Sequence, residues 1–98
     1  GRIVAPQVLA AHLSRLAAAS HWLVVDEAFA DAVPEVSLAG LVADDRSLVI
    51  FRSFGKFFGL AGLRLGFVLG PRALIARFRA ALGSWPVSAA ALAIGVAA

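Results

Sequence analysis

Apolar residues near the start of the chain recur with a helical period. Leu9, Leu13 and Leu16 stand at positions i, i+4 and i+7, which places them on one side of a helix. Pro6 suits the first turn, because the backbone N–H that proline lacks has no partner there anyway. The pattern predicts a helix over residues 6–19.

Helical patterns also occur later in the sequence. Apolar residues spaced by four predict a helix over residues 72–82, and Gly83 is expected to end it. An alanine-rich run predicts a further helix over residues 89–98. Ser37 is expected to cap a short helix over residues 37–42.

Three short apolar runs have the composition of strands. They cover residues 22–25, 47–52 and 65–69 and consist largely of leucine, β-branched and aromatic residues. The order helix, strand, short helix, strand is typical of α/β domains. We therefore predict an α/β fold with a mainly parallel sheet and flanking helices.

The composition indicates that these residues are part of a larger protein. Hydrophobic residues make up 61% of the sequence and charged residues 15%, against roughly 45–50% and 25% in typical domains. A domain of this size buries only about 60–65% of its surface. The chain is therefore too apolar to cover itself with polar groups.

Several classes of partner are not expected. The net charge is +3, but the basic residues are scattered and do not alternate with aromatic ones, so no nucleic-acid binding is predicted. His12 and His21 have no second ligand at a metal-binding spacing, so no metal site is predicted. Gly83 and Pro86 interrupt the apolar tail, so no membrane span is expected. The absence of cysteine fits a cytoplasmic protein.

A glycine-rich loop joins the second and third predicted strands and carries Lys56, the only lysine. An amine between apolar strands loses hydration, which favours the neutral form that attacks an aldehyde to form a Schiff base. Ser53 and Arg64 offer a hydroxyl and a fixed fork of donors, which suit a phosphate dianion. Phe57 stands where a nucleotide-binding P-loop needs serine or threonine. The loop therefore predicts a site for an aldehyde that carries a phosphate, and pyridoxal 5′-phosphate is such a molecule.

Asp26 directly follows the first predicted strand run. A carboxylate at the C-terminal end of a buried parallel strand faces the crevice in which α/β proteins bind ligands. Aspartate also caps tight turns through its own side chain. The residue pattern leaves both interpretations of Asp26 open.

The segment SFGKFFGLAGLRLGF, residues 53–67, resembles the lysine segment of fold-type I, class I and II aminotransferases, in which S/T-x-x-K-x-x-G-x-x-G-x-R recurs. The resemblance implies that Lys56 forms the Schiff base with pyridoxal phosphate and that Ser53 and Arg64 bind its phosphate. Gly55 departs from the pattern, because many relatives have a serine just before the lysine. It also implies that residues 1–98 belong to the large, cofactor-binding domain of a homodimeric enzyme.

A second segment, Asp26-Glu27-Ala28-Phe29, resembles the D-E-A-Y segment of the same family. The resemblance implies that Asp26 pairs with the pyridine nitrogen of the cofactor and keeps it protonated. Phe29 takes the place of the tyrosine that donates a hydrogen bond to the ring oxygen O3′. The resemblance thus places Phe29 beside the cofactor but removes that donor.

Two branches of the family fit the motifs, and both act on small phosphorylated substrates. The favoured branch, which DEAF and the later WPVS suggest, decarboxylates O-phospho-L-threonine to aminopropanol phosphate in cobalamin biosynthesis. The alternative branch transaminates histidinol phosphate and usually keeps the tyrosine. A hypothesis of another class is a truncated, non-catalytic fragment, because other parts of the family's site have no counterpart in these residues.

Overall fold

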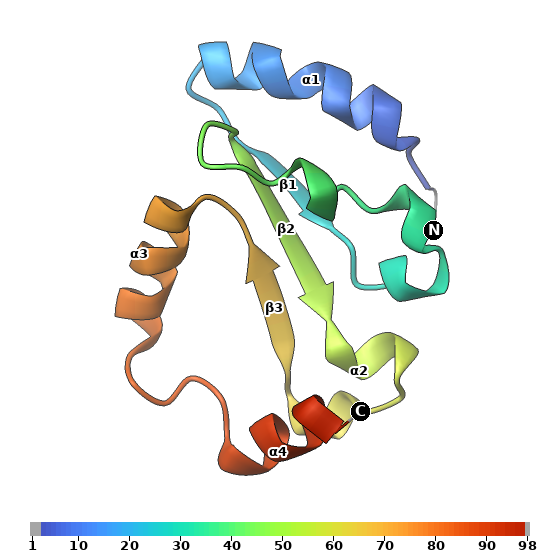
Figure 1. Cartoon of the computed structure of the whole chain (residues 1–98), viewed down its shortest axis with the longest axis vertical. Coiled ribbons are helices and arrows are strands. Elements are labelled where there is room, and N and C mark those ends of the chain that lie inside the picture. The colour runs from blue at the N-terminus through green and yellow to red at the C-terminus, as the bar shows by residue number, and fades with distance from the viewer. Residues whose placement is uncertain (1–2, 98) are drawn as a thin grey trace.

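A computed structural model describes residues 3–97 as an α/β arrangement around a three-stranded sheet (Figure 1). The strands, β1 (Leu23–Asp26), β2 (Leu48–Ser53) and β3 (Gly66–Leu69), lie in the order β1-β2-β3. Parallel pairing of β1 with β2 places Asp26 beside Phe51. Antiparallel pairing of β2 with β3 places Ser53 opposite Gly66. The α/β class is as predicted.

The expected predominance of parallel pairing is not found in these strands, because one of the two pairings is antiparallel. The reason lies in the connection from β2 to β3. A parallel return needs a crossover, usually a full helix. The helix available here, α2 (Phe54–Phe57), has 4 residues and rises only about 6 Å, whereas β2 is about 20 Å long. The chain therefore turns back as a hairpin.

The longer helices agree with their predicted positions. They are α1 (Pro6–Ala18), α3 (Arg72–Leu82) and α4 (Ala89–Ala97). Gly83, with φ of 78°, follows the last residue of α3. Residue 98, where the last predicted helix ends, lies outside the described residues.

The short helix expected over residues 37–42 forms as a 3₁₀ helix over Ala39–Leu41 and not as an α-helix. The segment between β1 and β2 instead contains short 3₁₀ turns, named η1 (Ala30–Ala32), η2 (Pro34–Val36) and η3 (Ala39–Leu41). Ser37 lies between the last two of these turns, and its hydroxyl accepts a hydrogen bond from the N–H of Ala39 at 3.1 Å. The side chain of Ser37 thus supports a turn rather than an α-helix.

The core lies on one face of the sheet, near the start and middle of the strands. Its buried members are Leu13 of α1, Leu38 of the turn segment, and Leu48 and Ile50 of β2. Leu48 and Ile50 are 0% exposed, and burying such a side chain stabilises a fold by about 1.5–3 kcal/mol. This core sets the position of β2, from which the loop with Lys56 continues.

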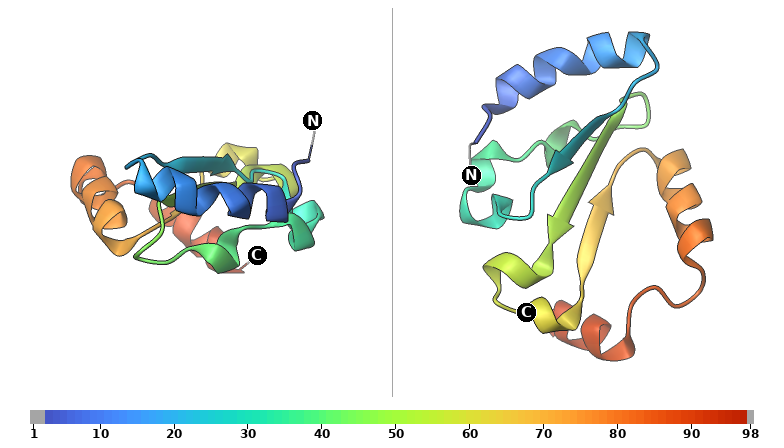
Figure 2. Two further views of the ribbon diagram at one scale, coloured as in Figure 1. Left: turned by 90° about the horizontal axis from the view of Figure 1, so that it is seen from above. Right: turned by 180° about the vertical axis from the view of Figure 1, so that it is seen from behind.

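Much apolar surface remains exposed, as the composition predicted. Examples are Trp85, which is 91% exposed, and Val24 of β1, which is 60% exposed. The molecule measures 41 × 31 × 19 Å, and α3 and α4 lie beside the strands rather than over them in both face-on views (Figures 1 and 2). Large parts of the sheet therefore lack a covering layer within residues 3–97.

No helix within residues 3–97 combines the length and the apolar character that crossing a bilayer requires.

Candidate active site

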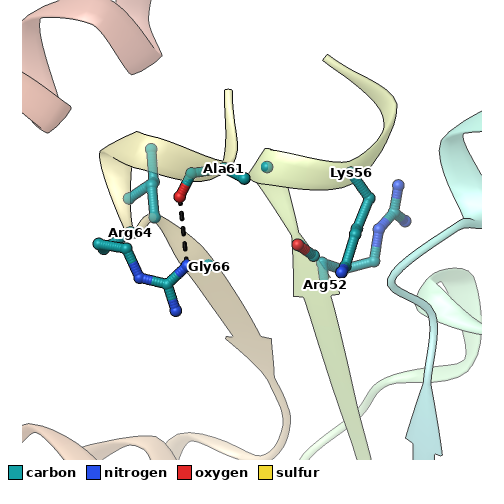
Figure 3. A pocket seen from close by; sticks show the side chains of 8 residues that line it. Arg52, Lys56, Ala61, Arg64 and Gly66 are labelled. Carbon is teal, nitrogen blue, oxygen red and sulfur yellow. Dashed lines mark hydrogen bonds between the residues drawn. The ribbon is translucent and has the colours of Figure 1, made fainter. Parts of the chain in front are cut away.

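The loop between β2 and β3 folds back on the end of β2. Gly59 adopts φ of 68° and donates its N–H to the carbonyl of Lys56 at 3.3 Å, which ends α2 after one turn. The fold-back creates a hollow of about 300 Å³, here called the loop hollow (Figure 3). It is lined by Arg52, Ser53, Gly55, Lys56, Ala61, Arg64, Leu65 and Gly66. Three predicted site residues, Ser53, Lys56 and Arg64, thus line one hollow.

Lys56 reaches the loop hollow from α2 and lies across it from Arg64 (Figure 3). Its Nζ is 5.9 Å from the centroid of the Phe29 ring, within the range of a cation–π contact. The side chain is exposed, so it does not lie between apolar strands as the sequence suggested. Residues 3–97 therefore do not supply the expected loss of hydration.

Ser53 and Arg64 are both available to an anion. Ser53 precedes α2, but its hydroxyl forms no capping hydrogen bond. Arg64 is exposed, and one of its nitrogens, Nη1, donates to the carbonyl of Ala61 at 3.2 Å (Figure 3). Within residues 3–97 no carboxylate forms an ion pair with Arg64 or Lys56.

The backbone of Arg64 is in the left-handed region, with φ of 54°. For a residue other than glycine this conformation is strained by about 1–3 kcal/mol, and such residues cluster at ligand sites. The strain falls on the residue that the motif assigns to the phosphate.

Gly55, which departs from the family pattern, has a steric reason to be glycine. A Cβ atom built on Gly55 would lie 2.7 Å from the Cα and 3.1 Å from the backbone nitrogen of Ala61. Backbone atoms cannot move aside as the end of a side chain can. The close approach of Ala61 therefore disfavours the serine that many relatives have at this position.

Asp26 ends β1 on the edge of the sheet where β2 also ends, here called the carboxyl edge. It is exposed and does not line the loop hollow. Its Oδ1 accepts the N–H of Ala28 at 2.9 Å, so the turn-capping interpretation is confirmed. Its Oδ2 accepts no hydrogen bond within the described residues and is free for a second role. Phe29 follows this turn and is 68% exposed.

Glu27 and Arg52 form a partly buried contact that the sequence reasoning missed. Glu27 is 6% exposed, and its Oε2 accepts a hydrogen bond from Arg52 at 3.4 Å. Arg52 also forms an ion pair with Asp31. The alternation of side chains along the strands could have predicted this pair. Glu27 falls on the core-facing side of β1, and Arg52 falls on the core-facing side of β2. Opposite charges at the ends of the apolar faces of two adjacent strands predict an ion pair.

The donor set around the loop hollow fits pyridoxal phosphate. It combines one amine, one hydroxyl without an internal partner and one arginine without a carboxylate partner, all from the described residues. The volume of about 300 Å³ lies at the lower end of the range for small-molecule sites. Amine, hydroxyl and guanidinium are the groups that an aldehyde with a phosphate requires.

A family model of aminotransferases of class I and II matches residues 1–98, so the chain belongs to the aminotransferase class I and II family. It is 50% identical over 97 residues to a threonine-phosphate decarboxylase of Sinorhizobium sp, covering 99% of this chain and 29% of that protein. It is 49% identical over 88 residues to a threonine-phosphate decarboxylase of Pseudomonas aeruginosa, covering 90% of this chain and 26% of that protein.

The chain also resembles a histidinol-phosphate aminotransferase of Serratia proteamaculans, with 42% identity over 66 residues, which is 67% of this chain and 18% of that protein. The predicted resemblance to this family and to its decarboxylase branch is confirmed. The chain spans less than a third of the length of these curated relatives.

Proposed function

We propose that these residues belong to a longer, cytoplasmic, pyridoxal-phosphate-dependent enzyme that decarboxylates O-phospho-L-threonine to aminopropanol phosphate in cobalamin biosynthesis. In this proposal residues 1–98 are part of its large, cofactor-binding domain. The observation that carries the proposal is identity of 50% and 49% to threonine-phosphate decarboxylases over nearly the whole chain. "Full-length protein" below means that polypeptide, or a chimera in which these residues replace the matching segment of the Sinorhizobium relative.

Each candidate residue has a role in this proposal. Lys56 holds the cofactor covalently through Nζ, while the Ser53 hydroxyl and the Arg64 guanidinium bind its phosphate. The Asp26 carboxylate holds a proton on the ring nitrogen, and the Phe29 ring lies beside the cofactor. When bound, pyridoxal phosphate supplies an electron sink for the pair left at the substrate Cα.

Lys56 has a second role during the reaction. Once the substrate amine took its place, the freed Nζ would keep the proton that the amine released and would lie next to the substrate. That proton would pass to Cα after CO2 had left, which is general acid catalysis by a positioned side chain.

Transamination of histidinol phosphate is the second candidate function, and the Serratia relative favours it. The two reactions differ in which bond of the substrate Cα stands perpendicular to the cofactor ring. Phe29 favours decarboxylation, because the resemblance associates phenylalanine at this position with the decarboxylase branch.

The choice is tested by incubating the cofactor-loaded full-length protein with O-phospho-L-threonine, and separately with histidinol phosphate and 2-oxoglutarate. We expect CO2 and aminopropanol phosphate from the first incubation and no glutamate from the second. Glutamate without CO2 would support the aminotransferase instead. Turnover of neither substrate would contradict both candidate functions.

The 98 residues alone are expected to be inactive and poorly soluble, since exposed apolar residues such as Trp85 and Val24 need covering. In the proposal, other parts of the full-length protein and a second subunit cover them. Light scattering should show a dimer of the full-length protein. A soluble, cooperatively unfolding 98-residue monomer that gains a visible absorption band with pyridoxal phosphate would contradict this expectation.

A further inference from the structure

Glu27 is the most completely bonded charged side chain at the carboxyl edge. Its Oε1 accepts the N–H of Leu38 at 2.6 Å, and its Oε2 accepts the hydroxyl of Ser37 at 2.7 Å and an N–H of Arg52 at 3.4 Å. A buried carboxylate is tolerated only when its oxygens are paired in this way. Glu27 therefore fastens the segment with Ser37 and Leu38 to the ends of β1 and β2.

Arg52 extends the connection on the other strand. One terminal nitrogen of its guanidinium contacts Glu27, and the other pairs with Asp31 of η1. This bridge needs two donors held in one plane, which arginine provides and lysine does not. Arg52 thus ties the end of β2 to the turn that follows β1.

The pair adjoins the residues proposed to bind the two ends of the cofactor, and Arg52 also lines the loop hollow. Glu27 follows Asp26, and Arg52 precedes Ser53. The N–H of Glu27 donates to the carbonyl of Phe51 at 2.8 Å, which continues the parallel ladder past Asp26. Because side chains alternate along strands, Glu27 and Arg52 share the core face, while Asp26 and Ser53 share the opposite face.

We propose, on the basis of the function proposed above, that Glu27 and Arg52 are positioning residues that fix the spacing between the Asp26 carboxylate and the Ser53 hydroxyl. The ring of pyridoxal phosphate is rigid and the arm to its phosphate is short, so the ring nitrogen and the phosphate must meet groups on two separate strands within a narrow range of spacings. The Glu27–Arg52 pair, on the core face of the sheet, holds the ends of β1 and β2 in register. A ligand that touches only one end does not sense this spacing.

That difference gives the test. In the cofactor-free full-length protein, the dissociation constants of pyridoxal phosphate and of inorganic phosphate are measured for Arg52→Lys. We expect pyridoxal phosphate to bind about tenfold more weakly, which is the loss of roughly one charge-assisted hydrogen bond. Inorganic phosphate, held by Ser53 and Arg64, should change less than about twofold. Loss of both affinities in parallel would indicate general damage to the loop and would overturn the proposal, as would no loss of either.

Two matched variants complete the experiment. Asp44→Ala removes the exposed ion pair of Asp44 with Arg72, away from the carboxyl edge, and should change neither affinity. Asp31→Asn weakens only one arm of Arg52 and leaves Glu27 in place. It should selectively weaken pyridoxal phosphate by about two- to threefold, because a neutral amide replaces one charged partner. If Arg52→Lys does not fold, Asp31→Asn decides the question. In that case the absence of a selective loss in Asp31→Asn would overturn the proposal.

The unsubstituted protein separates this inference from the function on which it rests. If it does not attach pyridoxal phosphate to Lys56, the proposed function fails and the positioning role fails with it. If it attaches the cofactor and Arg52→Lys binds it equally well, only the positioning role fails. A selective loss in Arg52→Lys supports the positioning role.

Discussion

The two ends of β1 and β2 differ in the kind of residue that they carry. At the start of the strands, Leu23 and Leu48 pack with Leu13 of α1 in the core. At the carboxyl edge, the same strands end in charged and hydroxyl-bearing residues, and the loop hollow opens next to them. The residues that stabilise the fold therefore lie at the start of the strands. The candidate site residues lie at the carboxyl edge, where α/β proteins bind ligands.

A second comparison lies within the carboxyl edge. Asp26 and Glu27 are adjacent carboxylates, but Glu27 is 6% exposed and bonded through both oxygens, whereas Asp26 is exposed and uses one oxygen for a turn. Alternation along the strand puts them on opposite faces. A bonded carboxylate supports structure, and a carboxylate with a spare oxygen can serve a ligand.

Replacing Lys56 with alanine should produce the largest effect. It should reduce turnover at the loop hollow and leave the stability of the core unchanged. In the full-length protein we expect turnover to fall by about 10²–10⁴-fold, because a positioned acid or base is lost together with the covalent anchor. Borohydride reduction and peptide mapping of the unsubstituted protein should find the cofactor on Lys56. A label on a lysine elsewhere in the full-length protein would refute the assignment. Without cofactor, the variant and the unsubstituted protein should have the same melting temperature.

Replacing Ile50 with alanine tests the stabilising end. Ile50 is 0% exposed, and removing such a side chain lowers the free energy of unfolding by about 2–5 kcal/mol. Urea unfolding of the cofactor-free full-length protein measures this loss. Asp45→Ala, in the exposed turn before β2, is the control and should stay within about 0.5 kcal/mol. Equal effects of the two variants would contradict the location of the core.

Replacing Asp26 with asparagine separates its two roles. The amide oxygen can still accept the N–H of Ala28, so the turn should persist. The amide cannot hold a proton on the ring nitrogen as a carboxylate does, and we expect turnover about ten- to a hundredfold slower with the cofactor still bound. Asp26→Ala should lose the turn contact as well. Turnover of Asp26→Asn at the unsubstituted rate would reduce Asp26 to a turn cap.

Replacing Gly55 with serine should affect stability and leave the affinity for pyridoxal phosphate no higher. It restores the residue of many relatives, but the new Cβ would meet the backbone of Ala61 at 2.7 Å. We expect the free energy of unfolding to fall by about 1–3 kcal/mol, as overpacking usually causes, and the affinity for pyridoxal phosphate not to rise. Gly40→Ser is the control, because nothing lies within 4 Å of a Cβ there. Tighter cofactor binding at unchanged stability would show that the loop adapts freely.

The sequence by itself determined the features that depend on neighbouring residues. The helical period of Leu9, Leu13 and Leu16 predicted α1 to within one residue of its end. Ser53 ends β2, and Lys56 and Arg64 lie in the glycine-containing connection that follows it, so chain connectivity alone brings the three near one another. Local spacing is a strong constraint over such short distances along the chain.

The tertiary structure decided the features that depend on residues far apart in the sequence. Glu27 and Arg52 are separated by 25 positions and meet only because β1 and β2 pair in one register. The exposure of Lys56 depends on the layers around the sheet, and the antiparallel return of β3 depends on a connection too short for a crossover. A residue pattern does not specify strand register or covering layers, because both arise from packing between distant segments.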